Sequence, residues 1–158
     1  MIDRITYAFG RISMSALFLV RGLNQIFDWR VADQEIAMAL MDWKGTLDGI
    51  EIGHRAFDLA YQYTFVLIGC AILGELVGAL CLLFGVKLRL GISLLILVWI
   101  PVVIFQHPFW LLSGVQREQE LMGFLLNGAV LGGLSSLLSG AILRKNSHRQ
   151  MIHFRGNQ

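Results

Sequence analysis

Residues 63–105 read YTFVLIGCAILGELVGALCLLFGVKLRLGISLLILVWIPVVIF, in which two long apolar runs are separated only by Gly85-Val86-Lys87. A helix needs ~20 mostly apolar residues to cross the ~30 Å hydrocarbon core of a membrane. Each run approaches that length, and in lipid a segment of this kind satisfies its backbone polar groups as a helix. The stretch therefore predicts two membrane-spanning helices, Tyr63–Phe84 and Leu88–Phe105, joined by a very tight turn.

Two more apolar stretches flank this pair, at Ile12–Trp29 and Leu121–Leu143. The composition agrees with a membrane protein, because 56% of the residues are hydrophobic and only 15% are charged. Soluble proteins carry about 25% charged residues. The small net charge of +2 gives no reason to expect nucleic acid as a partner. We therefore expect one all-α domain over residues 1–158, a polytopic membrane protein with four transmembrane helices in an antiparallel bundle.

The N-terminus also resembles a secretory signal, which is the alternative for its first helix. Arg4 and Arg11 precede a short apolar core at Ile12–Val20. Arg21 interrupts this core, and no cleavage site with small residues follows closely. We expect the first helix to be retained in the membrane.

The distribution of lysine and arginine predicts the orientation, since these residues gather in cytoplasmic loops. One side would hold Arg4, Arg11, Lys87, Arg89, Arg144, Lys145, Arg149 and Arg155. The other side would hold only Arg30, Lys44, Arg55 and Arg117. Both termini, with the tail 144–158, are therefore expected in the cytoplasm.

The connection 30–59 is rich in acidic residues, and we expect it to form a structured loop on the outer side. Within it, Ile36, Leu40 and Trp43 recur at helical spacing on one face. This pattern predicts a short helix at Asp33–Trp43, which would lie on the outer surface or pack on the bundle.

Arg21 and Glu75 are the charged residues that fall well inside predicted spans. Both lie ~13–14 Å from the inner boundary at ~1.5 Å per residue, so we expect them to pair. Ionisable groups in a membrane usually face a partner or a cavity. Two interpretations remain open: an ion pair that only fixes helix register, or a polar pocket for a headgroup such as a quinone carbonyl, or for a proton path.

Other polar residues extend from this pair toward the outer side: Asn24, Gln25, Gln106, His107 and Asn127. A track of this kind suits a small polar headgroup whose tail stays in lipid. Plain hydrogen bonding between helices is the alternative for each residue taken alone. The candidate binding residues are Arg21, Gln25, Glu75, His107, Trp110 and Asn127.

Glycines four residues apart occur in two predicted spans, as Gly74 and Gly78 and as Gly128 and Gly132. Small residues at this spacing allow helices to approach closely in lipid. Packing within the chain is the favoured interpretation, and dimerisation is the alternative. Pro101 removes a backbone hydrogen bond and is expected to kink its helix.

Sequence motifs for catalysis are lacking. The chain has no CxxC, glycine-rich phosphate loop, nucleophile elbow or paired-carboxylate site. His54 and Asp58 are four residues apart, but two ligands are too few to indicate a metal. We therefore expect no catalytic and no metal-binding residue, and a redox role would need a partner protein or a bound quinone.

The order of these features resembles the DoxX family of small four-helix bacterial membrane proteins. The resemblance rests on Arg11–Leu19, Gly22-Leu23-Asn24-Gln25, Glu75-Leu76-Val77-Gly78 with Gly85, His107-Pro108-Phe109-Trp110, and Asn127 followed by Gly132-Gly133. It covers about residues 11–143. Gln25 and Leu126 stand where the family pattern has lysine, so a mechanism that needs those charges is not implied here.

Members of this family resemble subunits of thiosulfate:quinone oxidoreductase and other membrane oxidoreductase components. The resemblance implies an accessory subunit of a quinone-linked redox complex in the bacterial inner membrane. Its expected partners are membrane lipid, other subunits of the complex and a non-covalently bound quinone. The alternative is a structural or assembly subunit of a larger, non-redox membrane complex.

Overall fold

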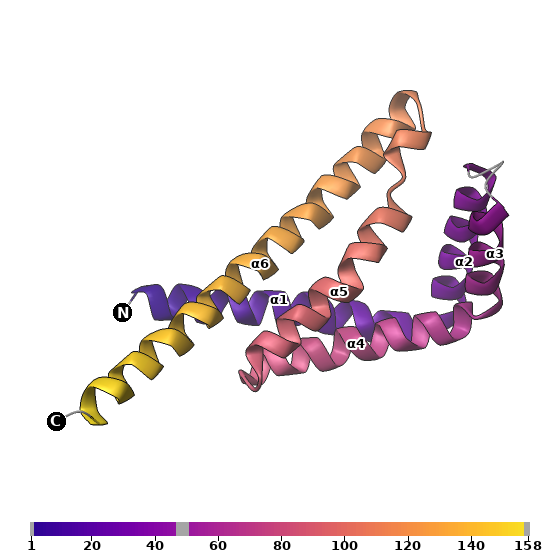
Figure 1. Ribbon diagram of the computed structural model, residues 1–158. Coiled ribbons are helices and arrows are strands. Elements are labelled where there is room, and N and C mark those ends of the chain that lie inside the picture. Colours follow the sequence, from indigo (N-terminus) through magenta and orange to yellow (C-terminus); the bar gives the residue numbers. More distant parts are fainter. Residues whose placement is uncertain (1, 47–50, 157–158) are drawn as a thin grey trace.

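The computed structural model describes residues 2–46 and 51–156, and within these ranges it contains helices and no strand. The elements are α1 (Ile2–Phe27), α2 (Trp29–Thr46), α3 (Glu51–Gln62), α4 (Thr64–Phe84), α5 (Leu88–Gln106), the short 3-10 helix η1 (Phe109–Leu111) and α6 (Gly114–Gly156). Figure 1 shows α1, α4, α5 and α6 as the long members, with α2 and α3 side by side at one end. The all-α prediction is confirmed for the described residues.

Three segments of the described residues are long and apolar enough to cross a membrane: Thr64–Phe84, Leu88–Leu111 and Gly114–Leu143. The first two coincide with the central spans expected from the sequence. α1 is also long, but it carries Arg11 and Arg21 within its apolar part and is not one of the three. Its passage through the membrane therefore stays a prediction.

α1 runs antiparallel to α4 along much of its length. Near one end Arg11 donates from Nε to Leu82 O at 3.0 Å, and from Nη2 to Leu83 O at 3.0 Å. Farther along, Ser15 donates to Ala79 O at 2.8 Å. At the other end the rings of Trp29 and Phe65 lie 4.9 Å apart. These contacts fix the register in which Arg21 lies opposite Glu75.

The turn between α4 and α5 is as tight as the sequence predicts. Gly85 ends α4 in the left-handed conformation, with φ of 73°, and Lys87 precedes α5 with φ of 45°. A glycine adopts this conformation without steric cost. Farther into the hairpin a Cβ on Gly78 would lie 3.0 Å from Gly91 O. The two helices therefore pack closely through glycines.

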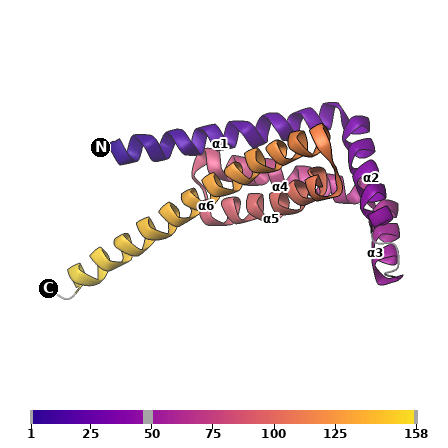
Figure 2. The ribbon, with the colours of Figure 1, turned by 90° about the horizontal axis from the view of Figure 1, so that it is seen from above.

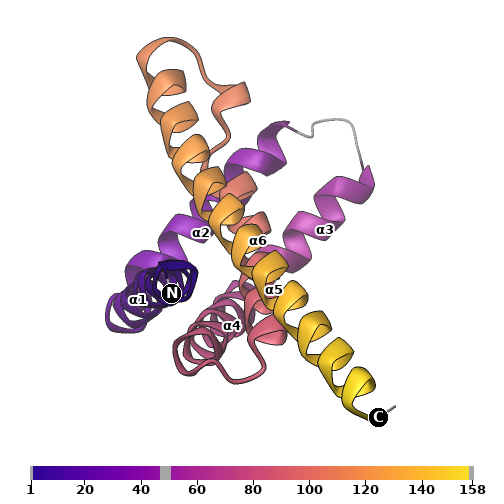
Figure 3. The same cartoon turned by 90° about the vertical axis from the view of Figure 1, so that its left-hand side faces the viewer.

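α5 packs on α6, and the core lies where these two helices meet α1 and α4. Fully buried members of this core include Phe18, Leu82, Ile92, Leu95 and Leu134. Figure 3, which looks along α1, shows α6 running obliquely past α1 and α4 instead of parallel to them. The antiparallel arrangement is therefore closest between α1 and α4 and between α4 and α5.

Several element boundaries differ from those expected. Trp29 begins α2 and does not close the first span, and the helix expected at Asp33–Trp43 extends over the whole of α2. The end of the expected loop 30–59 lies in α3, and residues 47–50 are outside the described ranges. α2 continues through polar sequence that hydropathy does not mark, because its apolar residues Ala32 and Leu40 are buried.

α6 also exceeds its expected range, beginning at Gly114 instead of Leu121 and continuing to Gly156. The expected tail 144–158 is thus helical through Gly156. Both additions are polar, and they extend the helix beyond its apolar segment. Pro101 lies inside α5, which continues through it to Gln106.

The two ends of the molecule are clearly distinct. The N-terminus, the α4–α5 turn and the C-terminal part of α6 lie at one end, and Figure 2 shows the same grouping from above. The opposite end holds α2, α3 and the connection between α5 and α6. This grouping agrees with the predicted topology, in which the basic segments share one side.

Candidate functional site

Arg21 and Glu75 form a buried ion pair between α1 and α4. Nη1 of Arg21 lies 2.9 Å from Oε1 of Glu75, and the exposed fractions of the two side chains are 22% and 1%. The pairing expected from their equal depth is confirmed. Removal of either partner would leave the other charge buried without compensation.

Trp99 of α5 holds the guanidinium group from a second side. Cζ of Arg21 lies 4.2 Å from the centre of the Trp99 ring, a distance at which a cation interacts favourably with an aromatic face. Trp99 itself is fixed by an edge-on contact with Phe18, with ring centres 4.9 Å apart. The sequence did not indicate this role, because a tryptophan within an apolar run is usually a packing residue.

The ion pair leaves hydrogen-bonding capacity unused. Oε2 of Glu75 is buried and has no hydrogen-bond partner in the structure. Among the described residues, Arg21 donates a hydrogen bond only from Nη1, so Nε and Nη2 remain available. Buried polar groups are nearly always hydrogen-bonded in native proteins, and an exception needs an explanation.

A cavity of about 540 Å³ lies beside the ion pair, and we call it the chamber. Its walls are mostly apolar and come from α2, α4 and α5, with Leu40, Ile68 and Val102 among them. Its polar lining residues are Arg21, Gln25, Glu75 and Gln106, together with Cys70. An apolar cavity with a few convergent polar groups is the usual form of a small-molecule site.

A second cavity of about 390 Å³ adjoins the chamber and shares Arg21, Gln25 and Gln106 with it. We call it the vestibule. Its own polar lining residues are Asn24, Asp28 and Glu35, and it is lined by α1, α2 and the end of α5. Two carboxylates make the vestibule acidic.

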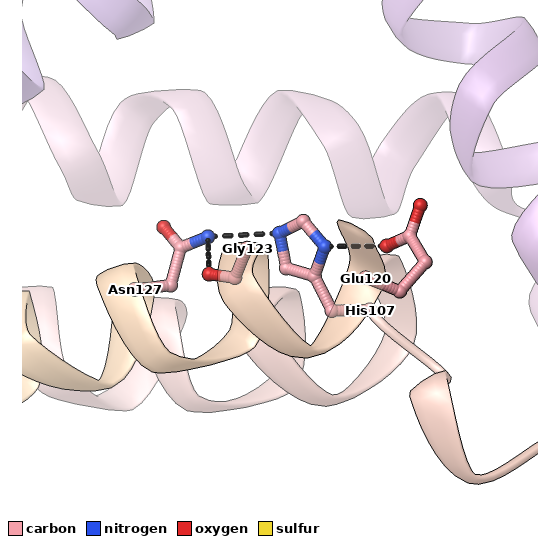
Figure 4. Close-up of polar contacts among 4 residues, drawn as sticks. All are labelled: His107, Glu120, Gly123 and Asn127. Carbon is pink, nitrogen blue, oxygen red and sulfur yellow. Dashed lines mark hydrogen bonds and ion pairs between the residues drawn. The ribbon is translucent and has the colours of Figure 1, made fainter. Parts of the chain in front are cut away.

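His107 belongs to a different cluster, which Figure 4 shows. Its Nδ1 lies 2.7 Å from Oε2 of Glu120, and its Nε2 lies 2.8 Å from Nδ2 of Asn127. The same Asn127 nitrogen donates to Gly123 O at 2.9 Å, which identifies it as the amide nitrogen. Nε2 of His107 therefore accepts, and Nδ1 carries the proton that is donated to Glu120.

This cluster ties the end of α5 to the beginning of α6. Both ring nitrogens of His107 are occupied, and a Cβ on Gly123 would lie 2.6 Å from the ring atom Cε1. Only glycine leaves room for the imidazole at this position. Neither His107 nor Asn127 lines the chamber or the vestibule, so their geometry favours the interhelical hydrogen bonding considered above.

The six candidate residues thus divide into three groups. Arg21, Gln25 and Glu75 line the chamber. His107 and Asn127 belong to the interhelical cluster, and Trp110 packs edge-on against Trp43. The two polar groups are linked through Trp99, whose Nε1 lies 3.4 Å from Asn127 O.

Glu120 was not among the candidates, because the sequence placed it in a connection. Once α6 begins at Gly114, Glu120 and Asn127 are seven residues apart on one helix face. A correct prediction of the start of α6 would therefore have placed Glu120 and Asn127 on the same helix face. Within the described residues, no group of three or more His, Cys, Asp or Glu side chains could hold a metal ion.

The family model for DoxX matches residues 6–108, well over half of the chain. The chain belongs to the DoxX family. The match extends from α1 to the end of α5, so Arg21, Gln25, Glu75 and His107 lie within the DoxX region, whereas Trp110 and Asn127 lie beyond it. Neither the comparison with curated proteins nor that with solved structures gives a match. Family and apolar helices together identify a multi-pass membrane protein.

Proposed function

We propose that this DoxX-family protein is an accessory subunit of a quinone-linked redox complex and holds the head of a quinone in the chamber. The observation that carries the proposal is the chamber, a cavity of about 540 Å³ with mostly apolar walls. Both residues of the Arg21–Glu75 ion pair are part of its lining. A quinone combines an apolar ring and tail with two carbonyl acceptors. The unused N–H groups of Arg21 are suitable donors to such a carbonyl.

The role is accessory in this proposal because a quinone exchanges electrons only with a second redox group. A partner protein in the membrane would supply that group. The structural interpretation of the Arg21–Glu75 pair remains the alternative, but a pair that only fixes register does not require a cavity beside it or an unpaired carboxylate oxygen.

The proposal includes α1 as a fourth span, with both termini on the cytoplasmic side of a bacterial inner membrane. Large apolar residues of α1 are exposed on the surface of the protein, among them Phe9, Ile12, Val20 and Leu23. The polar residues Arg11, Ser15 and Arg21 of α1 each donate a hydrogen bond to α4. This division suits a helix with one face toward lipid and the other toward the bundle.

Quinone binding can be tested on the protein purified in detergent, by titration with decylubiquinone and measurement of tryptophan fluorescence. We expect saturable quenching, since Trp99 lies against Arg21, which is one of the residues that line the chamber. Dodecylbenzene, which has no carbonyl group, should not compete. Equal competition by dodecylbenzene would show that the chamber takes any apolar molecule, and it would refute the proposal.

A variant that fills the chamber provides the matching test. Ala71 lines the chamber on α4, so Ala71→Phe should abolish saturable quenching. Leu80→Phe introduces the same side chain on the same helix at an exposed position outside the chamber lining, and it should bind like the parent protein. Unchanged binding in Ala71→Phe would place the quinone elsewhere.

The accessory role is tested by purification from native membranes, with identification of the co-purifying proteins and of extracted quinone. A redox protein as partner is the expected result. A non-redox membrane complex as partner, without quinone, would instead support a structural or assembly role.

A further inference from the structure

We infer that the chamber selects the reduced, hydroxyl-bearing quinol over the oxidised quinone. This inference rests on the proposed function and adds the redox state of the ligand. It starts from Glu75, whose Oε2 is a buried acceptor without a donor. An oxidised quinone head carries only acceptors and cannot satisfy this oxygen. Each quinol hydroxyl can donate one hydrogen bond and also accept one.

The donors and acceptors around the ion pair match a hydroxyl group. Oε1 of Glu75 is occupied by Nη1 of Arg21, while Oε2 is free to accept. Nε and Nη2 of Arg21 make no hydrogen bond among the described residues and are free to donate. A hydroxyl group placed at the pair could donate to Glu75 and accept from Arg21. A carbonyl group could use only the arginine.

Access to Oε2 requires a small movement of the carboxyl group. The oxygen is fully buried, although Glu75 is one of the residues that line the chamber. The last torsion of a glutamate side chain is soft, so rotation of the carboxyl group can present the second oxygen to the cavity. Arg21 is held against Trp99, and the carboxylate is therefore the partner that turns.

The charges favour an uncharged head. The Arg21–Glu75 pair is neutral as a unit, so a charged ligand would add an unpaired charge in a buried place. Asp28 and Glu35 in the vestibule disfavour anionic headgroups on that side of the pair. A phospholipid with a net negative charge fits these surroundings poorly, whereas a quinol is neutral.

One additional hydrogen bond to a carboxylate corresponds to a roughly 10–100-fold difference in affinity. Tighter binding of the reduced form also makes the bound quinone easier to reduce. The midpoint potential of the bound two-electron couple should rise by about 30 mV for each tenfold preference. This shift is a property of the ligand that a purely structural role of Glu75 would not produce.

The test measures the affinities of decylubiquinone and decylubiquinol for the purified protein under anaerobic conditions, by titration calorimetry, together with the midpoint potential of the bound couple. We expect the quinol to bind at least tenfold more tightly. Equal affinities, or tighter binding of the quinone, would overturn the inference and leave the proposed function standing. Binding of neither form would refute the proposed function as well.

Two substitutions of the same chemical kind locate the effect. Glu75→Gln replaces the carboxylate, whose Oε2 is unpaired, by an amide that can also donate, so the ratio of quinol to quinone affinity should fall to about one. Glu118→Gln makes the same change at an exposed residue of α6 that lines neither cavity, and the ratio of quinol to quinone affinity should stay as in the parent protein. A preference retained in folded Glu75→Gln would overturn the inference. If Glu75→Gln does not fold, the ratio of quinol to quinone affinity measured on the parent protein still tests the inference.

An uncharged glycerolipid also carries a hydroxyl group. Dioctanoylglycerol is therefore added as a competitor to the protein loaded with decylubiquinol. No displacement at equal concentration supports the quinol assignment. Displacement at equal concentration would show that any neutral lipid with a hydroxyl group is accepted, and it would overturn the assignment.

Discussion

At the residue scale, Glu75 combines two features that are rare together. It is among the largest fully buried side chains of the described structure, and one of its two carboxylate oxygens has no partner. Arg21 compensates its charge, and Trp99 in turn holds Arg21. The three residues come from α1, α4 and α5, so the pair is central to the packing of these helices as well as to the candidate site.

Substitutions at the pair should show strong coupling. Removal of one partner of a buried ion pair typically costs ~3–5 kcal/mol, whereas replacement of both by apolar residues is often nearly neutral. We therefore expect Arg21→Leu and Glu75→Leu each to lower the stability of the protein in detergent. The double variant should recover much of the loss, as measured by thermal unfolding.

Additive losses in the double variant would contradict this expectation and show that the two charges are independent. The same double variant also separates structure from function. If it folds well and still binds decylubiquinone as the parent does, the pair is only structural.

At the element scale, the two glycine pairs of the sequence have different roles. Gly74 and Gly78 of α4 face α5, where added Cβ atoms would lie 2.9 Å from Val98 Cγ2 and 2.7 Å from Leu95 Cγ. Packing within the chain is thus confirmed for this pair. Added Cβ atoms at Gly128 and Gly132 of α6 meet nothing within 4 Å. The second pair does not serve packing within the described chain.

Gly91→Ala should destabilise the α4–α5 hairpin. The new Cβ would lie 2.5 Å from Cys81 Cβ, an atom that can move only with its backbone, and overpacking of this kind typically costs ~1–3 kcal/mol. Gly132→Ala is the control, expected to be neutral or to stabilise by up to ~1 kcal/mol through helix propensity.

Thermal unfolding in detergent measures both variants. An equal effect of the two substitutions would contradict the close approach of α4 and α5. A change in oligomeric state in Gly132→Ala alone would support the dimerisation alternative for α6.

At the scale of the whole molecule, two arginine contacts lie at one end, and α2, which lines part of both cavities, lies at the opposite end. Arg11 donates to the last carbonyls of α4, and Arg89 donates to Ile142 O at 3.1 Å, both at the end that holds the α4–α5 turn. Arg11 lies at the carbonyl end of α4, where a cation interacts favourably with the helix dipole. The chamber and the vestibule are both lined in part by α2. Figure 1 shows α2 and α3 at the other end of the molecule.

Labelling with a membrane-impermeant thiol reagent tests the topology. In a background with Cys70→Ala and Cys81→Ala, new cysteines at Gln34 and Ser113 should react on intact cells. A cysteine at Lys87, and another added before Met1, should react only after the membrane is opened. These outcomes together require that α1, α4 and α5 each cross the membrane. Reaction of the added N-terminal cysteine on intact cells would show that α1 does not cross the membrane.

Features that depend on distance along the chain could be predicted from the amino-acid sequence. Apolar runs separated by a tight turn located α4 and α5, because a hydrocarbon layer requires helices of a fixed minimum length. Equal depth within two neighbouring spans predicted the contact of Arg21 with Glu75, because an unpaired charge is costly there. The basic residues also indicated which segments share one end.

Features that depend on the rotation of each helix about its axis could not be predicted from the sequence and became visible only in the folded protein. The polar residues expected to form one track divide between the chamber and the cluster of His107, Glu120 and Asn127, because each helix turns its side chains according to the packing of its neighbours. The same packing places Trp99 on Arg21 and leaves Oε2 of Glu75 unpaired. Hydropathy fixes how deep a residue lies, but only packing fixes which neighbour it faces.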